Sequence, residues 1–282
     1  MKIVELRIIL PIALEQFDVA DDYMILQRTM EESSGGEGIE FVSRDFYTTE
    51  DGRQGKHEHK IYHYKSRVPA WIRWAVPTSI ADFHEEAYST PPTTHLDYII
   101  PFFGERFQFS IDSSAHAFTS IEDIDNPANL NEEELKIREV RYLDIIDSAP
   151  LPKEERRLGG FVCEAAGIQQ LPPQGKEHDY KYPPKWVADY KGPMMFICKV
   201  LKTNVRIWGL QTRVENYIAN SLVPGILLES ARGIVYWAPD WAGMTPEDVK
   251  KLTDETFSKV NNMIEEAEKE NNQEEEQNDK KE

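Results

Sequence analysis

The stretch RFQFSIDS, residues 106–113, alternates more regularly than any other part of the chain. Phe107, Phe109 and Ile111 fall on one side of an extended chain, and the residues between them are polar. Successive side chains of a β-strand point to opposite faces, so this pattern predicts a strand with one buried and one polar face. A sheet with at least one covered face is therefore expected around it.

Four further segments have the Ile, Val and aromatic content that is typical of strands. They are residues 2–14, 39–65, 138–146 and 193–207. The second of them turns at Asp51-Gly52, which predicts a hairpin. Pro11 cannot donate a hydrogen bond to a neighbouring strand, so the end of the first segment is expected at an edge or a bulge.

Helices are predicted mainly in the second half of the chain. One helix is expected over 18–32, a short one between 69 and 90, and a long one over 211–236 that breaks at Pro224-Gly225. A last helix is expected to start at Thr245-Pro246, because Thr caps helix N-termini and Pro fits the first turn. Strands precede long helices without β-α-β alternation, which indicates an α+β fold with an antiparallel sheet.

Composition bounds the domain organisation and the partners. The chain has 282 residues and a net charge of −18, and residues 265–282 hold nine acids against three lysines. We expect a folded body over 1–263 and a disordered acidic tail over 264–282. Residues 147–192, rich in Pro, Gly and charge, are expected to form a long surface excursion. The charge argues against nucleic acid, and against long-range attraction to anionic membranes.

Cysteine use and hydropathy favour a protein of a reducing compartment. Cys163 and Cys198 lie far apart, without the spacing of a zinc site or a disulfide framework. No run approaches the roughly 18 apolar residues that a membrane span needs. The apolar N-terminus contains Glu5 and Arg7, which is unlike a signal peptide. A soluble, cytoplasmic protein is expected.

No motif of a common enzyme class is present. Gly35-Gly36-Glu37-Gly38 lacks the Lys and the strand-to-helix context of a phosphate loop and predicts a turn. The segment 84–88 is interpreted as helix surface, because it lacks the second His of a zinc protease. His57, His59 and His63 share one face of a strand and could bind zinc, or they could belong to an ordinary polar face. No carboxylate partner is placed by the sequence.

One lysine stands out because it lies in a very apolar strand. Lys199 shares its face with Met195, Ile197 and Leu201, as Ser113 shares the face of Phe109. A buried ammonium needs an anion nearby, because an unpaired charge is costly to desolvate. From the residues alone the anion could be a protein carboxylate or the phosphate of a ligand.

Six groups of residues then follow one another in a defined order: Ile8-Ile9-Leu10-Pro11, Gly35-Gly36-Glu37-Gly38, His59-Lys60-Ile61-Tyr62-His63, Trp208-Gly209-Leu210-Gln211, Val214-Glu215-Asn216, and Trp237 with Trp241 before Thr245. In sequence, order and spacing they resemble phosphatidylinositol transfer proteins over residues 1–263. The resemblance implies a START-like helix-grip fold. In that fold a curved, mostly antiparallel sheet and long C-terminal helices enclose one glycerophospholipid, with its headgroup inside.

The resemblance also implies what the protein does. It predicts a monomer that binds phosphatidylinositol, phosphatidylcholine or both, and exchanges the lipid between membranes during transient surface contact. No catalytic step, metal or cofactor is implied, since the lipid is cargo. A lipid-sensing module that acts through a protein partner is the alternative, and vesicle-to-vesicle transfer separates the two. An enzyme on the same fold, using the His cluster, is a third hypothesis.

Residue by residue, the resemblance places Lys60 and Lys199 against the lipid phosphate, with the hydroxyl of Ser113 beside them. The chain departs from the family pattern at four headgroup positions: Glu58 replaces Thr, Ser89 replaces Asn, Thr253 replaces Glu, and Asp21 replaces Gln. A membrane-docking Trp pair corresponds to Ile207-Trp208. An exchange loop is implied around residues 66–83, where Trp71 and Trp74 would share a helix face.

These departures leave two interpretations of the headgroup. The acid of the inositol site could have moved from position 253 to Glu58, so that phosphatidylinositol is retained. Alternatively, Glu58 and Asp21 could attract the choline cation, as acids and aromatic faces do. Net charge favours the second interpretation, which predicts that phosphatidylcholine is bound at least as well as phosphatidylinositol.

Overall fold

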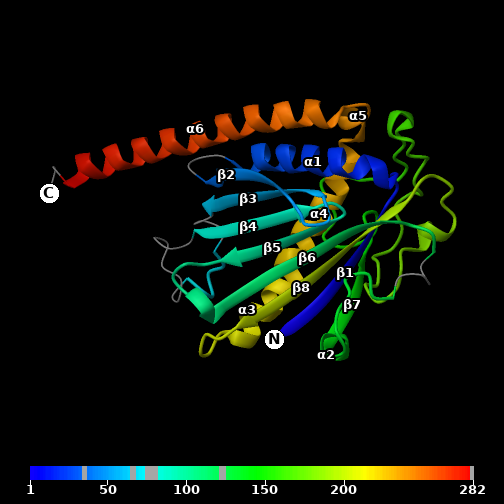
Figure 1. Cartoon of the computed structure of the whole chain (residues 1–282), viewed down its shortest axis with the longest axis horizontal. Coiled ribbons are helices and arrows are strands. Elements are labelled where there is room, and N and C mark those ends of the chain that lie inside the picture. The colour runs from blue at the N-terminus through cyan, green and yellow to red at the C-terminus, as the bar shows by residue number, and fades with distance from the viewer. Residues whose placement is uncertain (34–36, 64–67, 74–81, 121–124, 280–282) are drawn as a thin grey trace.

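The computed structural model describes residues 1–33, 37–63, 68–73, 82–120 and 125–279, and one eight-stranded sheet organises them (Figure 1). The strand order is β2-β3-β4-β5-β6-β8-β1-β7, and the neighbours are antiparallel except for the parallel pair β1–β7. The strands are β1 Lys2–Leu10, β2 Gly38–Thr48, β3 Gln54–His63, β4 Phe83–Thr90, β5 Thr93–Ile99, β6 Phe107–Ala117, β7 Arg138–Leu143 and β8 Met195–Val205.

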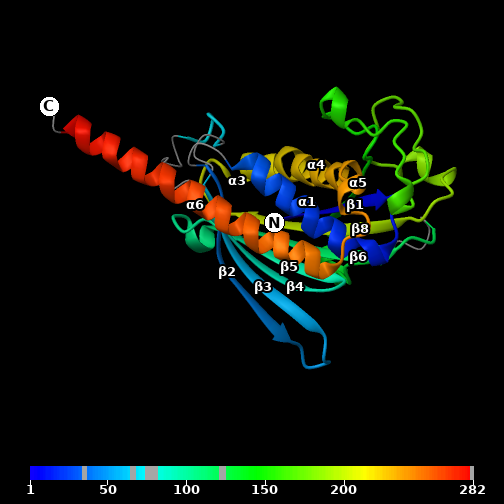
Figure 2. The same ribbon diagram turned by 90° about the horizontal axis from the view of Figure 1, so that it is seen from above.

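Helices α1, α4 and α6 cover one face of this sheet, and α1 packs against both α4 and α6 (Figure 2). The helices are α1 Phe17–Glu32, α2 Glu132–Ile137, α3 Gln211–Tyr217, α4 Val223–Tyr236, α5 Ala238–Trp241 and α6 Pro246–Asp279, with a π-helical turn at Ile218–Leu222 between α3 and α4. The cap expected for the last helix is present, since Thr245 Oγ1 accepts a hydrogen bond from the Asp248 N–H. The α+β class and the helix-grip arrangement are confirmed.

Strands β1 and β8 form the centre of the core. Almost every residue of β1 is buried on both faces, and even Glu5 is fully buried. Its carboxylate is paired with Arg7 at 2.6 Å and Arg138 at 2.8 Å, which compensates the charge. The excursion over 147–192 packs against this core through Leu158, Ile168, Leu171, Trp186 and Val187. It is therefore anchored to the body.

The sequence-based expectation was wrong for residues 83–90, and the strand that follows them was not predicted. We expected a short helix between 69 and 90, with residues 84–88 on its surface, but Phe83–Thr90 is strand β4 and Thr93–Ile99 is strand β5. The inward-facing residues of β4 include Glu85, which is buried. A carboxylate at an inward position breaks the apolar alternation that identifies a strand from sequence.

The C-terminal helix is fastened to the edge of the sheet. The side-chain amide of Asn261 on α6 accepts a bond from the Phe41 N–H at 3.1 Å and donates one to the Phe41 carbonyl at 2.9 Å. Phe41 belongs to β2, the edge strand, and its ring stacks on Phe257 of α6. The structure continues α6 to Asp279, whereas a disordered tail was expected from residue 264.

Candidate functional site

Five polar side chains form a row across the face of the sheet that the helices cover. Direct cross-strand pairing runs from Lys56 to Ser89, on to Thr94, then to Ser113, and finally to Lys199. Paired residues of neighbouring strands point to the same face, so the row lies inside the molecule. Thr94 Oγ1 donates to Ser89 Oγ at 3.2 Å. We call these five residues the polar row.

Lys199 is the last residue of the polar row, and no described residue places an anion in contact with its ammonium. Within the described part of the chain, its ammonium makes neither a hydrogen bond nor an ion pair. Burial lowers its pKa, and the nearby charges of Asp21 and Glu85 oppose this change. A buried ammonium without a contacting anion is costly, so the position is suited to an anionic ligand group.

Asp21 on α1 faces the same region from the helix layer. Burial raises the pKa of Asp21 to about 6, and the positive charge of Lys199 acts against that rise. Both side chains are only half-buried, although burial is the largest cause of both pKa shifts. Side chains that are desolvated yet keep accessible surface are those that border an internal space. The pair Asp21 and Lys199 therefore lines the interior between α1 and the sheet.

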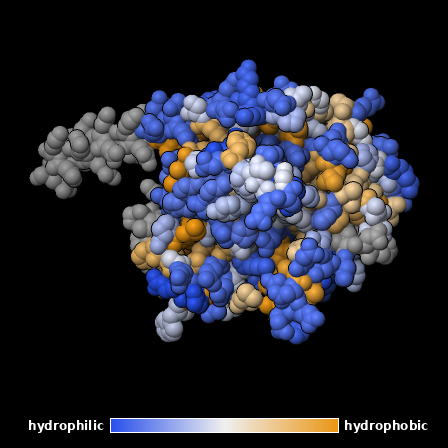
Figure 3. Space-filling model, viewed as in Figure 1, coloured by the Kyte–Doolittle hydropathy of each residue, from blue (hydrophilic) through white to orange (hydrophobic). Residues whose placement is uncertain are grey.

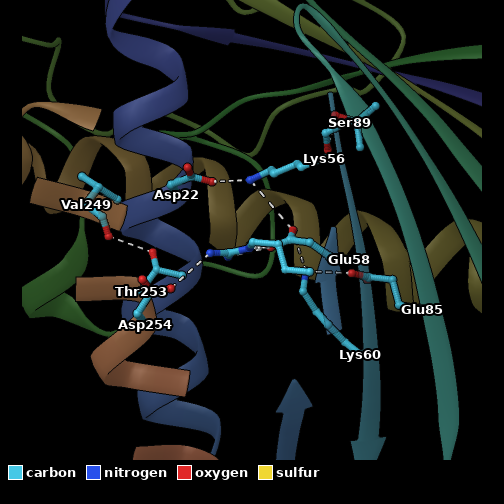
Figure 4. Close-up of polar contacts among 11 residues, drawn as sticks. Asp22, Lys56, Glu58, Lys60, Glu85, Ser89, Val249, Thr253 and Asp254 are labelled. Carbon is cyan, nitrogen blue, oxygen red and sulfur yellow. Dashed lines mark hydrogen bonds and ion pairs between the residues drawn. The ribbon is translucent and has the colours of Figure 1, made fainter. Parts of the chain in front are cut away.

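A network of ionic side chains lies beside the polar row, on β2, β3 and β4 (Figure 4). Lys60 Nζ donates to Glu85 Oε1 at 3.0 Å, and Tyr62 donates to the other oxygen of Glu85 at 2.8 Å. Glu58 accepts from Arg44 Nε at 2.7 Å and lies 3.7 Å from Lys60. Lys60 is thus paired with a protein carboxylate, unlike Lys199.

The charges of this network compensate one another although they are buried. Burial alone would raise the pKa of Glu58, but Lys60, Lys56 and Arg44 together lower it to about 2. Burial likewise acts to raise the pKa of Glu85. The charge of Lys60 and the hydrogen bonds that Glu85 accepts outweigh burial, so the pKa of Glu85 is lowered. Both carboxylates are therefore ionised at neutral pH.

The network reaches across to α6. Arg44 Nη1 lies 3.6 Å from Asp254, and its guanidinium stands 4.8 Å from the ring centre of Phe257. Thr253 is buried on the same helix, and its hydroxyl donates to the Val249 carbonyl at 2.8 Å (Figure 4). Arg44 therefore connects the ionic network on the sheet to α6, the helix that closes the interior.

The residues expected to dock at membranes lie in different surroundings. Trp208, on the turn between β8 and α3, is 97% exposed, whereas Ile207 packs partly against the core. Trp71 is half-buried against α3. Its ring centre lies 5.8 Å from that of Tyr217 and 4.3 Å from the guanidinium carbon of Arg213. Trp74 and most of the expected exchange loop lie outside the described residues.

The histidines of β3 point away from the polar row. His57 bonds to Glu86 at 2.7 Å, and His59 bonds to His84 at 2.9 Å. His63 lies between Glu40 and an aspartate. In the described ranges, no group of three His, Cys, Asp or Glu side chains could hold a metal ion. These histidines instead have carboxylates or His84 as partners.

Sequence reasoning missed several members of the site. Lys56 and Thr94 join the polar row only through strand register, which the sequence does not show. Glu85 and Arg44 were missed as well. The sequence carries little signal for β4, because only Phe83 and Ala87 among its inward positions are apolar.

The comparisons with known proteins agree with this geometry. The family model described as phosphatidylinositol transfer protein matches residues 1–258. Among curated proteins, phosphatidylinositol transfer protein 5 of Dictyostelium discoideum is 32% identical over 257 residues, covering 89% of this chain and 83% of its own. Phosphatidylinositol transfer protein 2 of the same organism is 29% identical over 269 residues, covering 94% and 98%.

A longer relative matches through one part only. Membrane-associated phosphatidylinositol transfer protein 1 of Homo sapiens is 30% identical over 264 residues, which cover 91% of this chain and 20% of that protein. None of the described helices has both the length and the hydropathy needed to span a membrane.

Proposed function

The chain belongs to the phosphatidylinositol transfer protein family, and from this premise we propose that it binds one phospholipid beneath α1, α4 and α6 and exchanges it between membranes. The observation that carries the proposal is Lys199, a desolvated ammonium that has no contacting anion among the described residues. The phosphate of the lipid would supply that anion. Ser113, next along the polar row, would donate a hydroxyl hydrogen bond to the same phosphate.

The proposal gives the two lysines different roles. Lys199 would contact the phosphate directly, whereas Lys60 is occupied by Glu85 at 3.0 Å. Lys60 would therefore act by keeping the Glu85 carboxylate oriented toward headgroup hydroxyls. The phosphate contact is common to all glycerophospholipids, so Lys199 would set affinity without setting headgroup preference.

The structure changes the balance between the two headgroup interpretations. The choline interpretation requires Glu58 to offer a free negative charge, but Glu58 is bound by Arg44 and lies within 4 Å of Lys56 and Lys60. A compensated carboxylate attracts a quaternary ammonium weakly. Paired carboxylates and amines with spare hydrogen-bond capacity suit the hydroxyls of inositol. We therefore favour phosphatidylinositol as the preferred cargo.

The remaining features follow from lipid exchange. The protein would act in the cytoplasm as a monomer, touch membranes transiently, and carry out no chemical step, with no metal, cofactor or nucleic acid. A lipid-sensing role through a protein partner is the alternative. Transfer between two vesicle populations distinguishes them, because a sensor need not release its lipid.

The decisive experiment compares two lysines of one strand. Lys199→Met keeps the length of the side chain and removes its charge, and Lys202→Met is the matched control on the opposite face of β8, where Lys202 pairs with Glu134. Mass spectrometry of lipid extracted from each purified protein measures loading. Loss of every phospholipid class in Lys199→Met, with normal loading in Lys202→Met, is expected. Equal loading of both would refute the phosphate contact.

A further inference from the structure

Two turns at one end of the sheet are joined into a single surface. Residues 100–106 connect β5 to β6, and residues 206–210 connect β8 to α3. The Arg206 N–H donates to the Arg106 carbonyl at 2.7 Å, and the Arg206 guanidinium donates to the Glu105 carbonyl at 2.6 Å. We call residues 100–106 and 206–213 the turn surface.

The turn surface exposes two large aromatic side chains. Trp208 is 97% exposed and Phe102 is 50% exposed, while Phe103 beside it is buried and anchors the turn. On the face shown in Figure 3, hydrophilic residues predominate and hydrophobic ones lie in separate patches. Aromatic side chains on adjoining turns can enter the headgroup region of a bilayer together.

The charge of the turn surface is opposite to that of the chain. It carries Arg106, Arg206 and Arg213 against one acid, Glu105, whereas the chain has 32 Lys and Arg against 50 Asp and Glu. All three arginines are exposed. Within the described ranges they contact backbone carbonyls or a Trp ring and no carboxylate. Their charges therefore remain available to an external anion.

We propose that the turn surface docks on bilayers that contain anionic lipid, with Phe102 inserting beside Trp208 and the three arginines contacting lipid headgroups. The inference rests on the proposed function, since it assigns the surface through which the lipid would be exchanged. Arg213 also stacks on Trp71 at 4.3 Å, which ties residues 68–73 to the same end of the molecule. Because the net charge of −18 repels such membranes at long range, the attraction acts only within about one Debye length, ~8–10 Å.

The first test removes the charge. Vesicles of phosphatidylcholine, with and without phosphatidylserine, are sedimented with wild-type protein and with the triple variant Arg106→Gln, Arg206→Gln, Arg213→Gln. Each lost charge should weaken binding to the anionic vesicles about fivefold, and added salt should remove the difference. The control is Arg157→Gln, an exposed arginine of the 147–192 excursion, at the opposite end of β8. A triple variant that binds as well as this control would overturn the proposal.

The second test follows insertion directly. A polarity-sensitive fluorophore is attached to Phe102→Cys and, as control, to Tyr182→Cys, which replaces a residue that is 63% exposed in the excursion. Labelling is selective because Cys163 and Cys198 are buried. A blue shift on phosphatidylserine vesicles for position 102 alone is expected, and equal spectra at the two positions would contradict the proposal.

Failure of the inference and failure of the proposed function give different results. A wild-type protein that transfers phospholipid equally to neutral and anionic vesicles, with the triple variant equal to its control, rejects the turn surface and keeps the function. A protein that binds anionic vesicles through the turn surface and never carries lipid keeps the docking surface and rejects the function. Melting temperatures of the variants, expected to match wild type, confirm that these exposed substitutions leave the fold intact.

Discussion

Ser113 and Lys199 are direct cross-strand neighbours on β6 and β8, with a hydroxyl and an ammonium side by side on the covered face of the sheet. The two side chains come from the clearest amphipathic strand of the sequence and from a very apolar one. Their pairing creates a donor site for an anion in the middle of an apolar wall.

Removing the hydroxyl beside Lys199 should weaken phospholipid binding without changing headgroup preference. In Ser113→Ala, one hydrogen bond to the phosphate is lost, with a net value of about 1 kcal/mol, so affinity should fall roughly fivefold. Competition between phosphatidylinositol and phosphatidylcholine in vesicles measures both properties. Ser110→Ala, on the outer face of β6, is the control and should bind as wild type does.

Phospholipid affinity should increase as the pH falls from 8 to 5. Asp21 is ionised above its raised pKa of about 6 and then repels a phosphate at Lys199, whereas below pH 6 it is neutral. Asp18, Asp22 and Lys56 also carry charges close to Asp21. Since Asp21 is only one of these charges, we expect its titration to change phospholipid affinity several-fold. Asp21→Asn should bind equally at both pH values. An Asp21→Asn protein that retains the wild-type pH profile would argue that another group controls it.

The raised pKa of Asp21 also makes the stability of the fold depend on pH. The folded state holds the Asp21 proton more tightly than the unfolded chain, whose ordinary value is 3.8, so the contribution of Asp21 is full below about pH 4 and is lost as the pH rises through 6. Glu58 acts in the opposite direction. Its pKa of about 2 lies below the ordinary 4.5, so its contribution is present above pH 4.5 and is lost as the pH falls toward 2. Denaturant titrations of Asp21→Asn and Glu58→Gln across pH measure the two terms separately.

Breaking the buried pair of Lys60 and Glu85 should destabilise the protein. In Glu85→Gln, the carboxylate that remains near the Lys60 ammonium is Glu58, at 3.7 Å. The substitution should therefore lower the free energy of unfolding by roughly 3 kcal/mol. Urea denaturation provides the measurement. Glu86→Gln, the next residue on the opposite face of β4, should cost less than about 1 kcal/mol. If the two variants proved equally stable, the interior position of Glu85 would be in error.

Loosening α6 should speed transfer. Asn261→Ala removes both bonds to Phe41, which together contribute about 1–3 kcal/mol, and should let α6 leave the sheet more often. Amide exchange at Phe41 should accelerate, and the rate of lipid transfer between vesicles should rise. Asn262→Ala replaces the exposed neighbour and should change neither rate.

The sequence identifies single faces well and relationships between strands poorly. The inward faces of Lys199 and Ser113 followed from alternation within β8 and β6, since a period of two is a local property. That Lys56 and Thr94 lie in the same row depends on the register of five strands. Register depends on turn geometry and on packing between distant segments, so no single stretch encodes it.

Charged residues explain most of the remaining errors. Strand β4 was taken for a helix because Glu85 occupies an inward position, where the expectation is an apolar residue. The pairing that makes this burial acceptable involves Lys60 and Tyr62, on a strand that precedes it by some twenty residues. Likewise, Glu58 looked like a free acid until Arg44, across the hairpin, was seen to bind it.

The amide of Asn261 has one more consequence, for the behaviour of the protein in a crowded solution. Strand β2 ends the sheet, and an unprotected edge strand is a template on which other chains can add and aggregate. Asn261 occupies the Phe41 N–H and carbonyl, so α6 shields the edge as well as closing the interior. Release of α6 would therefore expose the β2 edge to other chains. If lipid exchange opens α6 only at a bilayer, as proposed, this edge stays covered while the protein is in solution.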